Sequence, residues 1–170
     1  MKIMTGIGVT LFISLFFAVG FGVLGYAINS LWASKAAGTW PTTEGRILRC
    51  EIKESRDSDG STYETQVEYG YTVAGSHYKG TRIAFGYAGS SGRRAHQEIA
   101  DRLIDAKTVL VRYDPSDASR AVLSYGINRS TIFMFVFGVT WLLFISGLTA
   151  LTVLMARSDA GVLGTLVTTR

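Results

Sequence analysis

Two long stretches without a charged side chain dominate this 170-residue sequence. They cover residues 3–34 and 130–156 and are 32 and 27 residues long. Both exceed the roughly 20 apolar residues that an α-helix needs to cross the hydrocarbon core of a bilayer. The first is also longer than the roughly 7–15 apolar residues of a cleavable signal peptide. We therefore expect a first transmembrane helix within residues 1–33, a second over residues 130–156, and a short tail at 157–170.

Most of the charged residues lie between these stretches, in a segment that we expect to fold as one β-rich soluble domain over residues 34–129. Residues 33–129 contain 14 Lys/Arg and 12 Asp/Glu, a balance of +2 (14 − 12). The rest of the net charge of +4 lies near the chain ends, where basic residues commonly flank membrane helices. The domain therefore lacks the basic surface of a nucleic-acid-binding protein, and we expect no nucleic-acid partner. A single cysteine, Cys50, excludes an internal disulfide.

Alternation of apolar and polar residues predicts the first strand. In "RILRCEIK", Leu48, Cys50 and Ile52 occupy one face, and charged residues occupy the other. This pattern is typical of a half-buried strand. The following "SRDSDGS" consists of turn residues, so we expect a polar loop over residues 55–61.

The segment "TYETQVEYGYTVAGSHYKGTRIAFG" predicts a hairpin of two strands. Its first half alternates strictly, and "AGSH" supplies Gly75 for the positive φ of a tight turn. In the return strand, Tyr78 is at an even position, whereas Ile83 and Phe85 are at odd positions. A β-bulge at Gly80 would place all three on one face, and we expect one there.

The next segment changes period. In "SSGRRAHQEIADRLIDA", Ala95, Ile99, Ala100 and Leu103 recur at helical spacing, which predicts a short amphipathic helix. Two further strands follow, in "KTVLVRYD" and "RAVLS". Five antiparallel strands, with one short helix between the third and fourth, predict a small barrel or strongly bent sheet. This order resembles an OB-type barrel, a resemblance of fold that does not fix function.

The stretch "VRYDPSDASRAVL" connects the last two strands. Asp114 and Pro115 are the residue types that a type I turn prefers at its first two positions. Asp117 can accept hydrogen bonds from the backbone in the same way. Because this interpretation explains every residue of "YDPSD", it is favoured over a metal-binding or catalytic role.

Three blocks in order, "WPTTEGRIL", "VEYGYTVAGSHYKGTRIAFG" and "VRYDPSDASRAVL", carry a family resemblance. The chain resembles a widespread bacterial family of small two-helix membrane proteins that is known as a domain of unknown function. It departs from the family pattern in having "LIDAK" in place of a Tyr-Pro before the fourth strand, and Ala118 where a second proline is common. The resemblance implies no activity and no catalytic residue. The structural signature residues that it implies are Trp40, Pro41, Gly45, Tyr71, Gly75, Tyr78, Gly80, Tyr113, Asp114 and Pro115.

Small residues recur every four positions along the first apolar stretch. This ladder would let another helix approach closely, either the second apolar stretch or a second copy of the chain. The match of "GFGVLG" in the same stretch to a dinucleotide fingerprint is false, because no strand precedes it. The ladder consists of Gly6, Thr10, Ser14, Ala18 and Gly22, and the small residues of the second stretch are Ser146, Gly147 and Ala150.

The three tryptophans carry separate expectations. Trp141 falls near the middle of the second stretch, so its indole N–H should bond to a hydroxyl or carbonyl of a neighbouring helix. Trp32 and Trp40 lie where an interfacial aromatic belt is expected. His77 and His96 have no further metal-ligand residues at suitable spacing, and we expect no zinc site.

No pattern groups the acid, base or metal-binding side chains that an active site needs. We therefore expect a non-enzymatic integral membrane protein, without a cofactor, whose β domain binds a protein partner or self-assembles at the membrane face. A pore or transport accessory subunit is the alternative, disfavoured because neither span carries a charged residue. A membrane-bound enzyme is the third possibility. The family resemblance implies a bacterial cytoplasmic membrane, and the positive-inside rule leads us to expect cytoplasmic termini and an extracytoplasmic β domain.

Overall fold

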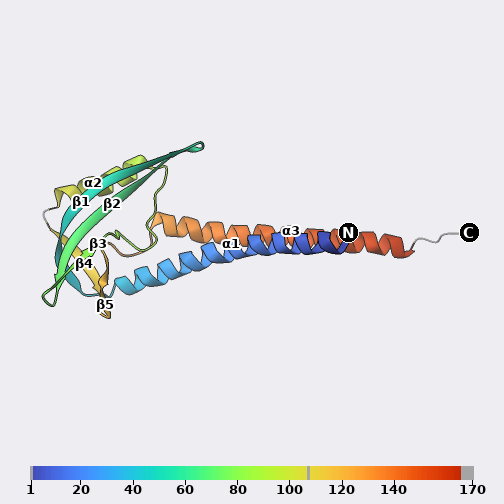
Figure 1. The fold of residues 1–170 in the computed structure, drawn as a ribbon, viewed down its shortest axis with the longest axis horizontal. Coiled ribbons are helices and arrows are strands. Elements are labelled where there is room, and N and C mark those ends of the chain that lie inside the picture. Colours follow the sequence, from blue (N-terminus) through green and yellow to red (C-terminus); the bar gives the residue numbers. More distant parts are fainter. Residues whose placement is uncertain (1, 107, 166–170) are drawn as a thin grey trace, which may run out of the picture. The chain divides into compact units, whose positions relative to one another are not determined.

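The computed structural model describes the backbone of residues 2–106 and 108–165, and the side chains of residues 8–106, 108–155 and 157 (Figure 1). The chain divides into two compact units, a helical unit of Met1–Tyr26 with Met134–Arg170, and a β unit of Ala27–Phe133. In order, the elements are α1 (Lys2–Ala37), β1 (Thr42–Asp57), β2 (Gly60–Val73), β3 (Ser76–Gly80), α2 (Arg93–Asp105), β4 (Val109–Asp114), β5 (Asp117–Val122) and α3 (Arg129–Thr165).

The two uncharged stretches form the long helices α1 and α3. Within them, Gly8–Ala37 and Arg129–Met155 are long and apolar enough to cross a membrane by length and composition. Helix α1 continues past the predicted residue 33 to Ala37, where Gly38 and then Pro41 prevent further helix. Helix α3 extends beyond the predicted residue 156 into the segment that we expected to be a tail.

The five strands form one antiparallel sheet in the order β3-β2-β1-β4-β5. Strand number, antiparallel pairing and the helix α2 between β3 and β4 match the prediction. The predicted polar turn between the strands is present, but it is shorter than residues 55–61, because β1 and β2 pair as far as Asp57 and Gly60. Only Ser58 and Asp59 form the turn, and Gly60 accommodates it with a φ of +133°. The residues at this end of the two strands are polar and exposed, and polar residues are tolerated there because a strand exposed to water has no face to bury.

The hairpin between β2 and β3 has the predicted position. Ala74 and Gly75 both have positive φ values, 49° and 83°, as a type I′ turn requires. The predicted bulge at Gly80 is wrong, because the ladder stays regular from Val73↔Ser76 to Tyr69↔Gly80 and β3 then ends. Glycine is needed there for another reason, since a Cβ would lie 2.5 Å from the ring of Tyr69.

A bulge does occur in β1, where the register with β2 shifts between Ile47 and Arg49. The extra residue reverses the alternation, so that Ile47 and Cys50, rather than Leu48 and Cys50, pack toward the core. Leu48 is instead 55% exposed. The expectation that Leu48 shares a face with Cys50 is therefore wrong.

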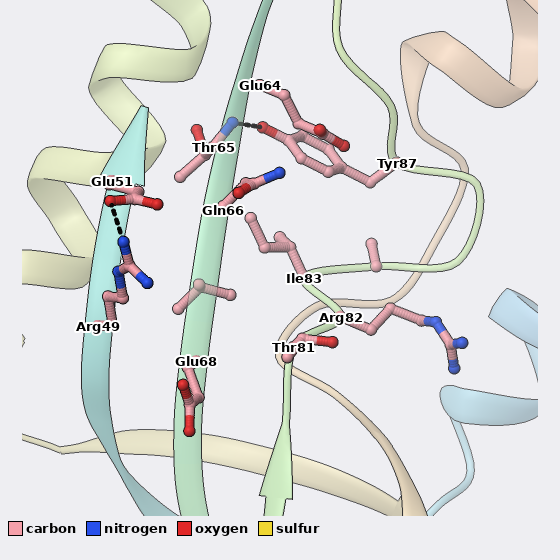
Figure 2. Close-up of a pocket in the computed structure, with 12 residues that line it drawn as sticks. Arg49, Glu51, Glu64, Thr65, Gln66, Glu68, Thr81, Arg82, Ile83 and Tyr87 are labelled. Atoms are coloured by element: carbon pink, nitrogen blue, oxygen red, sulfur yellow. Dashed lines mark hydrogen bonds and ion pairs between the residues drawn. The ribbon is translucent and has the colours of Figure 1, made fainter. Parts of the chain in front are cut away.

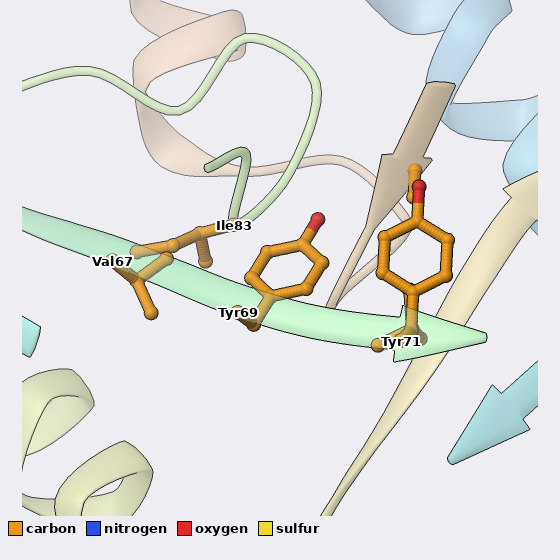
Figure 3. Packing of buried hydrophobic residues seen from close by; sticks show 6 residues of the cluster. Val67, Tyr69, Tyr71 and Ile83 are labelled. Carbon is orange, nitrogen blue, oxygen red and sulfur yellow. The ribbon is translucent and has the colours of Figure 1, made fainter. Parts of the chain in front are cut away.

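The core of the β unit lies on the concave side of the sheet (Figure 3), where Tyr69 is fully buried between Val67 and Tyr71 on β2. Among the described residues, no hydrogen-bonded pairing joins the two edge strands, so the sheet is not closed and the barrel prediction is wrong. A side chain spans the opening instead, because the Tyr71 hydroxyl donates to the Ala118 carbonyl of β5 at 2.7 Å. The remaining core residues are Ile83, Val111 and Ala121, with Ile99 and Leu103 of α2 packed against them.

Candidate functional site

The glycines and aromatic residues of the family signature have packing roles. A Cβ at Gly45 would lie 2.6 Å from Val111 and 2.9 Å from the Gly70 carbonyl, so this crossing of β1 needs glycine. Tyr71 and Tyr78 stack with ring centroids 5.7 Å apart, and Tyr113 packs against the same core. The pKa of the Tyr71 hydroxyl is raised by burial.

Trp40 is buried inside the β unit, which contradicts its expected place in an interfacial belt. Its ring meets the edge of Phe85 at 5.8 Å between centroids, and both pack with Val122. Trp32 is 68% exposed, as an interfacial residue would be. The reversal at Gly38 and Pro41 turns Trp40 back onto the sheet rather than outward.

The turn after β4 has the predicted structural role. Asp114 accepts hydrogen bonds from the backbone N–H of Ser116 at 2.9 Å and from its hydroxyl at 2.6 Å. These bonds hold the pKa of the Asp114 carboxyl below its usual value. Asp117 binds Ser119 in the same way, at 3.1 Å and 2.6 Å. Pro115 follows Asp114 at the turn, and both carboxylates are committed to the backbone, as a turn rather than a catalytic pair requires.

The described residues of the small-residue ladder on α1 do not face α3. The two helices touch instead through other glycines: a Cβ on Gly20 would lie 2.6 Å from Leu142, and a Cβ on Gly138 would lie 3.2 Å from Leu24. Gly22 has nothing within 4 Å of a Cβ position. The surroundings of Gly6 lie outside the described side chains. The other ladder residues, Thr10, Ser14 and Ala18, are exposed, as are Ser146, Gly147 and Ala150 of α3.

The indole N–H of Trp141 bonds to a neighbouring helix, as predicted. Its indole N–H donates to the backbone carbonyl of Phe16 on α1 at 2.9 Å. The Trp141 ring also stacks on the Phe16 ring, with the centroids 5.6 Å apart. This contact fixes which faces of α1 and α3 meet within the helical unit.

A polar pocket of the β unit lies where β2 loses its partner strand (Figure 2). Its volume is about 500 Å³, and it separates β2 from the segment that follows β3. Ion pairs line the rim: Arg49 binds Glu51 at 2.9 Å, and Lys79 binds Glu68 at 2.8 Å. The Glu68 carboxyl has a lowered pKa because of Lys79. Arg82 of the rim is exposed too, and its guanidinium carbon lies 4.9 Å from the centroid of the Phe85 ring.

A buried histidine holds one end of this pocket. His96 of α2 bonds through Nδ1 to the Tyr87 hydroxyl at 2.7 Å and through Nε2 to Ser90 Oγ at 2.9 Å. Tyr87 accepts a bond from the Thr65 N–H at 3.2 Å, and the Thr65 hydroxyl donates to the His96 carbonyl at 2.8 Å. Burial lowers the pKa of His96, so the ring is neutral at pH 7. The network clamps the segment after β3 onto β2, a role that the sequence did not reveal.

Strand β1 has a long free edge, which sequence reasoning also missed. It pairs with β4 only over Thr42–Gly45, and no described strand pairs with that side of β1 beyond Gly45. On β2, the N–H and C=O groups of Tyr63 both form hydrogen bonds with the backbone of Ser90. The backbone groups of the odd-numbered residues of β2 therefore point away from β1. The even-numbered residues of β2 therefore bond to odd-numbered residues of β1, such as Lys53 opposite Glu64. After the bulge, from Cys50 to Asp57, the N–H and C=O groups of the even-numbered residues of β1 point outward along the free edge.

The described residues contain no group of three or more His, Cys, Asp or Glu side chains that could hold a metal ion. Burial is the main cause of a raised pKa at the Cys50 thiol, which disfavours the reactive thiolate. No buried side-chain polar atom among the described residues lacks a hydrogen-bond partner.

Comparison with known proteins places the chain in a family. No curated protein matches it significantly. A family profile described as a domain of unknown function, DUF3592, matches residues 43–128, which is 86 of the 170 residues and spans β1 to the start of α3. The glycines, tyrosines and Asp-Pro turn described above lie within this match. The chain belongs to the DUF3592 family.

Proposed function

We propose that this chain is a non-enzymatic integral membrane protein that self-assembles, with a second copy docking along the free edge of β1. Its two long apolar helices support residence in a membrane, because each has the length and hydropathy of a spanning segment. The family resemblance favours a bacterial cytoplasmic membrane, and Lys2 near the amino terminus favours termini inside and the β unit outside.

The unpaired edge of β1 is the observation that carries the proposal. Beyond Gly45 the strand continues for twelve residues to Asp57, and every second residue directs its N–H and C=O away from the sheet. Such an edge is a template for an added strand, which gains backbone hydrogen bonds along its length. After the bulge at Leu48 the strand is regular, so an added strand can stay in register.

In an antiparallel register that this edge allows, opposite charges of two copies face each other. When two copies of β1 are centred on Ile52, Glu51 of each copy lies opposite Lys53 of the other. These positions do not exchange backbone bonds, so their side chains lie closest to each other. Shifting the centre to residue 51 or 53 would instead place Glu opposite Glu or Lys opposite Lys. Charge therefore favours the register centred on Ile52, in which two attractive pairs form, over these two shifts.

Cross-linking tests this register in the full-length protein. In a Cys50→Ser background, Glu51→Cys and Lys53→Cys chains with different tags are co-reconstituted in bilayers and oxidised. A disulfide is expected between the two variants and not within either variant alone. Equal cross-linking in all three samples would show random collision, and no cross-link in any sample would refute the proposed docking edge.

Charge reversal gives a second test with a matched control. Glu51→Lys turns both attractive pairs into repulsive ones, at a cost of about 1.5 kcal/mol, or roughly tenfold in the dissociation constant. The double variant Glu51→Lys, Lys53→Glu restores opposite charges and is expected to assemble as the wild type does. Dissociation constants would be measured by fluorescence energy transfer in bilayers. If the double variant were as weak as the single one, the pairing in this register would be wrong.

A further inference from the structure

The loop between β5 and α3 is fixed to the last turns of α1. The Ser34 hydroxyl donates to the Gly126 carbonyl at 2.7 Å, and the Gly126 N–H donates back to the same oxygen at 2.9 Å. Gly126 allows this geometry with a φ of +102°. The Tyr125 ring packs beside Gly38, and the Arg112 guanidinium lies 4.3 Å from its centroid. The 124–128 loop is therefore fixed to the β unit by hydrogen bonds and packing.

This held loop presents large apolar side chains outward. Tyr125 is 53% exposed and Ile127 is 69% exposed, on either side of the anchored Gly126. Trp32 on the adjoining turn of α1 is exposed as well. A rigid loop that keeps apolar side chains in water loses the free energy of burying them, so such a surface indicates a contact.

The charged residues near the loop show where it lies relative to the two uncharged stretches. Lys35 is the first charged residue after the uncharged stretch of α1, and Arg129 is the last before that of α3. Both are exposed. Ser34, which holds Gly126, is the neighbour of Lys35. The loop is thus bound to the chain at the position where the apolar run of α1 ends.

We propose that the 124–128 loop is a membrane-surface anchor that inserts Tyr125 and Ile127 into the headgroup layer of a phospholipid bilayer. The proposal rests on the membrane residence put forward under Proposed function. Tyrosine suits this layer because its ring is apolar and its hydroxyl is polar, and isoleucine gains by reaching the acyl boundary. Lys35 and Arg129 then lie at the depth of the lipid phosphates. Continuity with two apolar helices favours lipid as the occupant over a protein.

Spin labelling of the full-length protein in lipid nanodiscs tests the anchor. A nitroxide is attached at Ile127→Cys in the Cys50→Ser background, and its collision rates with oxygen and with a water-soluble nickel complex are compared. Oxygen concentrates in lipid and the nickel complex in water. The ratio of oxygen to nickel accessibility at residue 127 is expected to be several-fold higher than at a label on Asp59→Cys, in the exposed turn between β1 and β2.

A label at Val19→Cys, an exposed position in the middle of α1, separates the two proposals. If residue 19 is in lipid and residue 127 is as accessible to nickel as residue 59, the anchor is refuted while membrane residence stands. If residue 19 is also accessible to nickel, membrane residence itself fails. A label at residue 127 shielded from both reagents would show that protein covers the loop, which also overturns the lipid assignment.

Discussion

Replacing Gly80 with alanine tests how tightly the core of the β unit is packed. A Cβ at this position would lie 2.5 Å from two ring carbons of Tyr69 and 2.6 Å from its hydroxyl oxygen. Real Cβ atoms do not approach so closely, so the Tyr69 ring would have to move. Tyr69 is fully buried and donates a hydrogen bond to the Arg82 carbonyl at 3.0 Å, and that bond is lost if the ring moves.

The expected cost follows from these two effects. Overpacking a dense core costs about 1–3 kcal/mol, and a lost buried hydrogen bond adds about 1 kcal/mol. We therefore expect Gly80→Ala to lower the free energy of unfolding by about 3 kcal/mol. For a domain of about 100 residues, this lowers the midpoint of thermal unfolding by roughly 12–20 °C.

Gly70→Ala is the matched control on the neighbouring strand. A Cβ there would meet only Leu48, at 3.5 Å or more, which is ordinary van der Waals contact. We expect a change within about 0.5 kcal/mol for this variant. Both variants would be measured as full-length protein in detergent by near-ultraviolet circular dichroism, which follows buried tyrosines. Equal effects of the two substitutions would refute the close approach of Gly80 to Tyr69.

Three further predictions concern polar contacts. His96 has a folded-state pKa below its usual 6.5, so the unfolded chain takes up the proton first as pH falls. Stability should be level above about pH 7 and decrease below 6.5, and His96→Gln should reduce this slope in denaturant titrations at several pH values. Tyr71→Phe removes the bond to the Ala118 carbonyl and should cost about 1 kcal/mol in the same titrations, whereas no loss would show that this bridge does not hold the sheet. Trp141→Phe removes the bond to the Phe16 carbonyl and should weaken the contact of α1 with α3 by about 0.6–1.7 kcal/mol in unfolding by sodium dodecyl sulfate, with no change refuting that bond.

The number and type of elements could be predicted because each has a local signal. The tight turn at Ala74 and Gly75 follows from its residues, and α2 follows from a change of period at Arg93. Alternation failed at Leu48 because one inserted residue reverses the face of everything after it. The local alternation of apolar and polar residues does not mark the position of this insertion.

The helix contact was only half predictable. The indole N–H of Trp141 needs a hydrogen-bond acceptor in an apolar helix, which follows from chemistry alone. The Phe16 carbonyl is that acceptor. The choice of face was not predictable, because α1 carries small residues on more than one side. Gly20 rather than Gly22 meets α3, since Gly20 leaves room for Leu142 and the indole ring. The composition of one helix cannot indicate which of its small residues will contact the side chains of the partner helix.

The clamp around His96 could not be predicted, because its partners lie far apart in the chain. Thr65, Tyr87 and Ser90 have no spacing that marks them as a network. The free edge of β1 is likewise a property of the sheet order, which no single strand reveals.

The folding unit of this protein is larger than its family match. Residues 43–128 contain all of the sheet except Thr42. Phe85 and Val122 of that segment are nevertheless buried by Trp40 and by α1 residues Ala33 and Ala37. Cutting the chain at the family boundary would expose these side chains to water, at a cost of roughly 1.5–3 kcal/mol for each large one. Because net stability is only about 5–15 kcal/mol, this loss is a large part of the total.

The ends of both long helices therefore belong to the fold of the β unit. The Phe85 carbonyl accepts a bond from the Asn128 side chain at 2.7 Å, and Asn128 in turn accepts a bond from the N–H of Thr131, in the first turn of α3. On the α1 side, Ser34 holds the loop at Gly126. The β unit therefore includes residues 27–37 of α1 and the first turn of α3, and a second copy docked along the free edge of β1 would bind this larger unit.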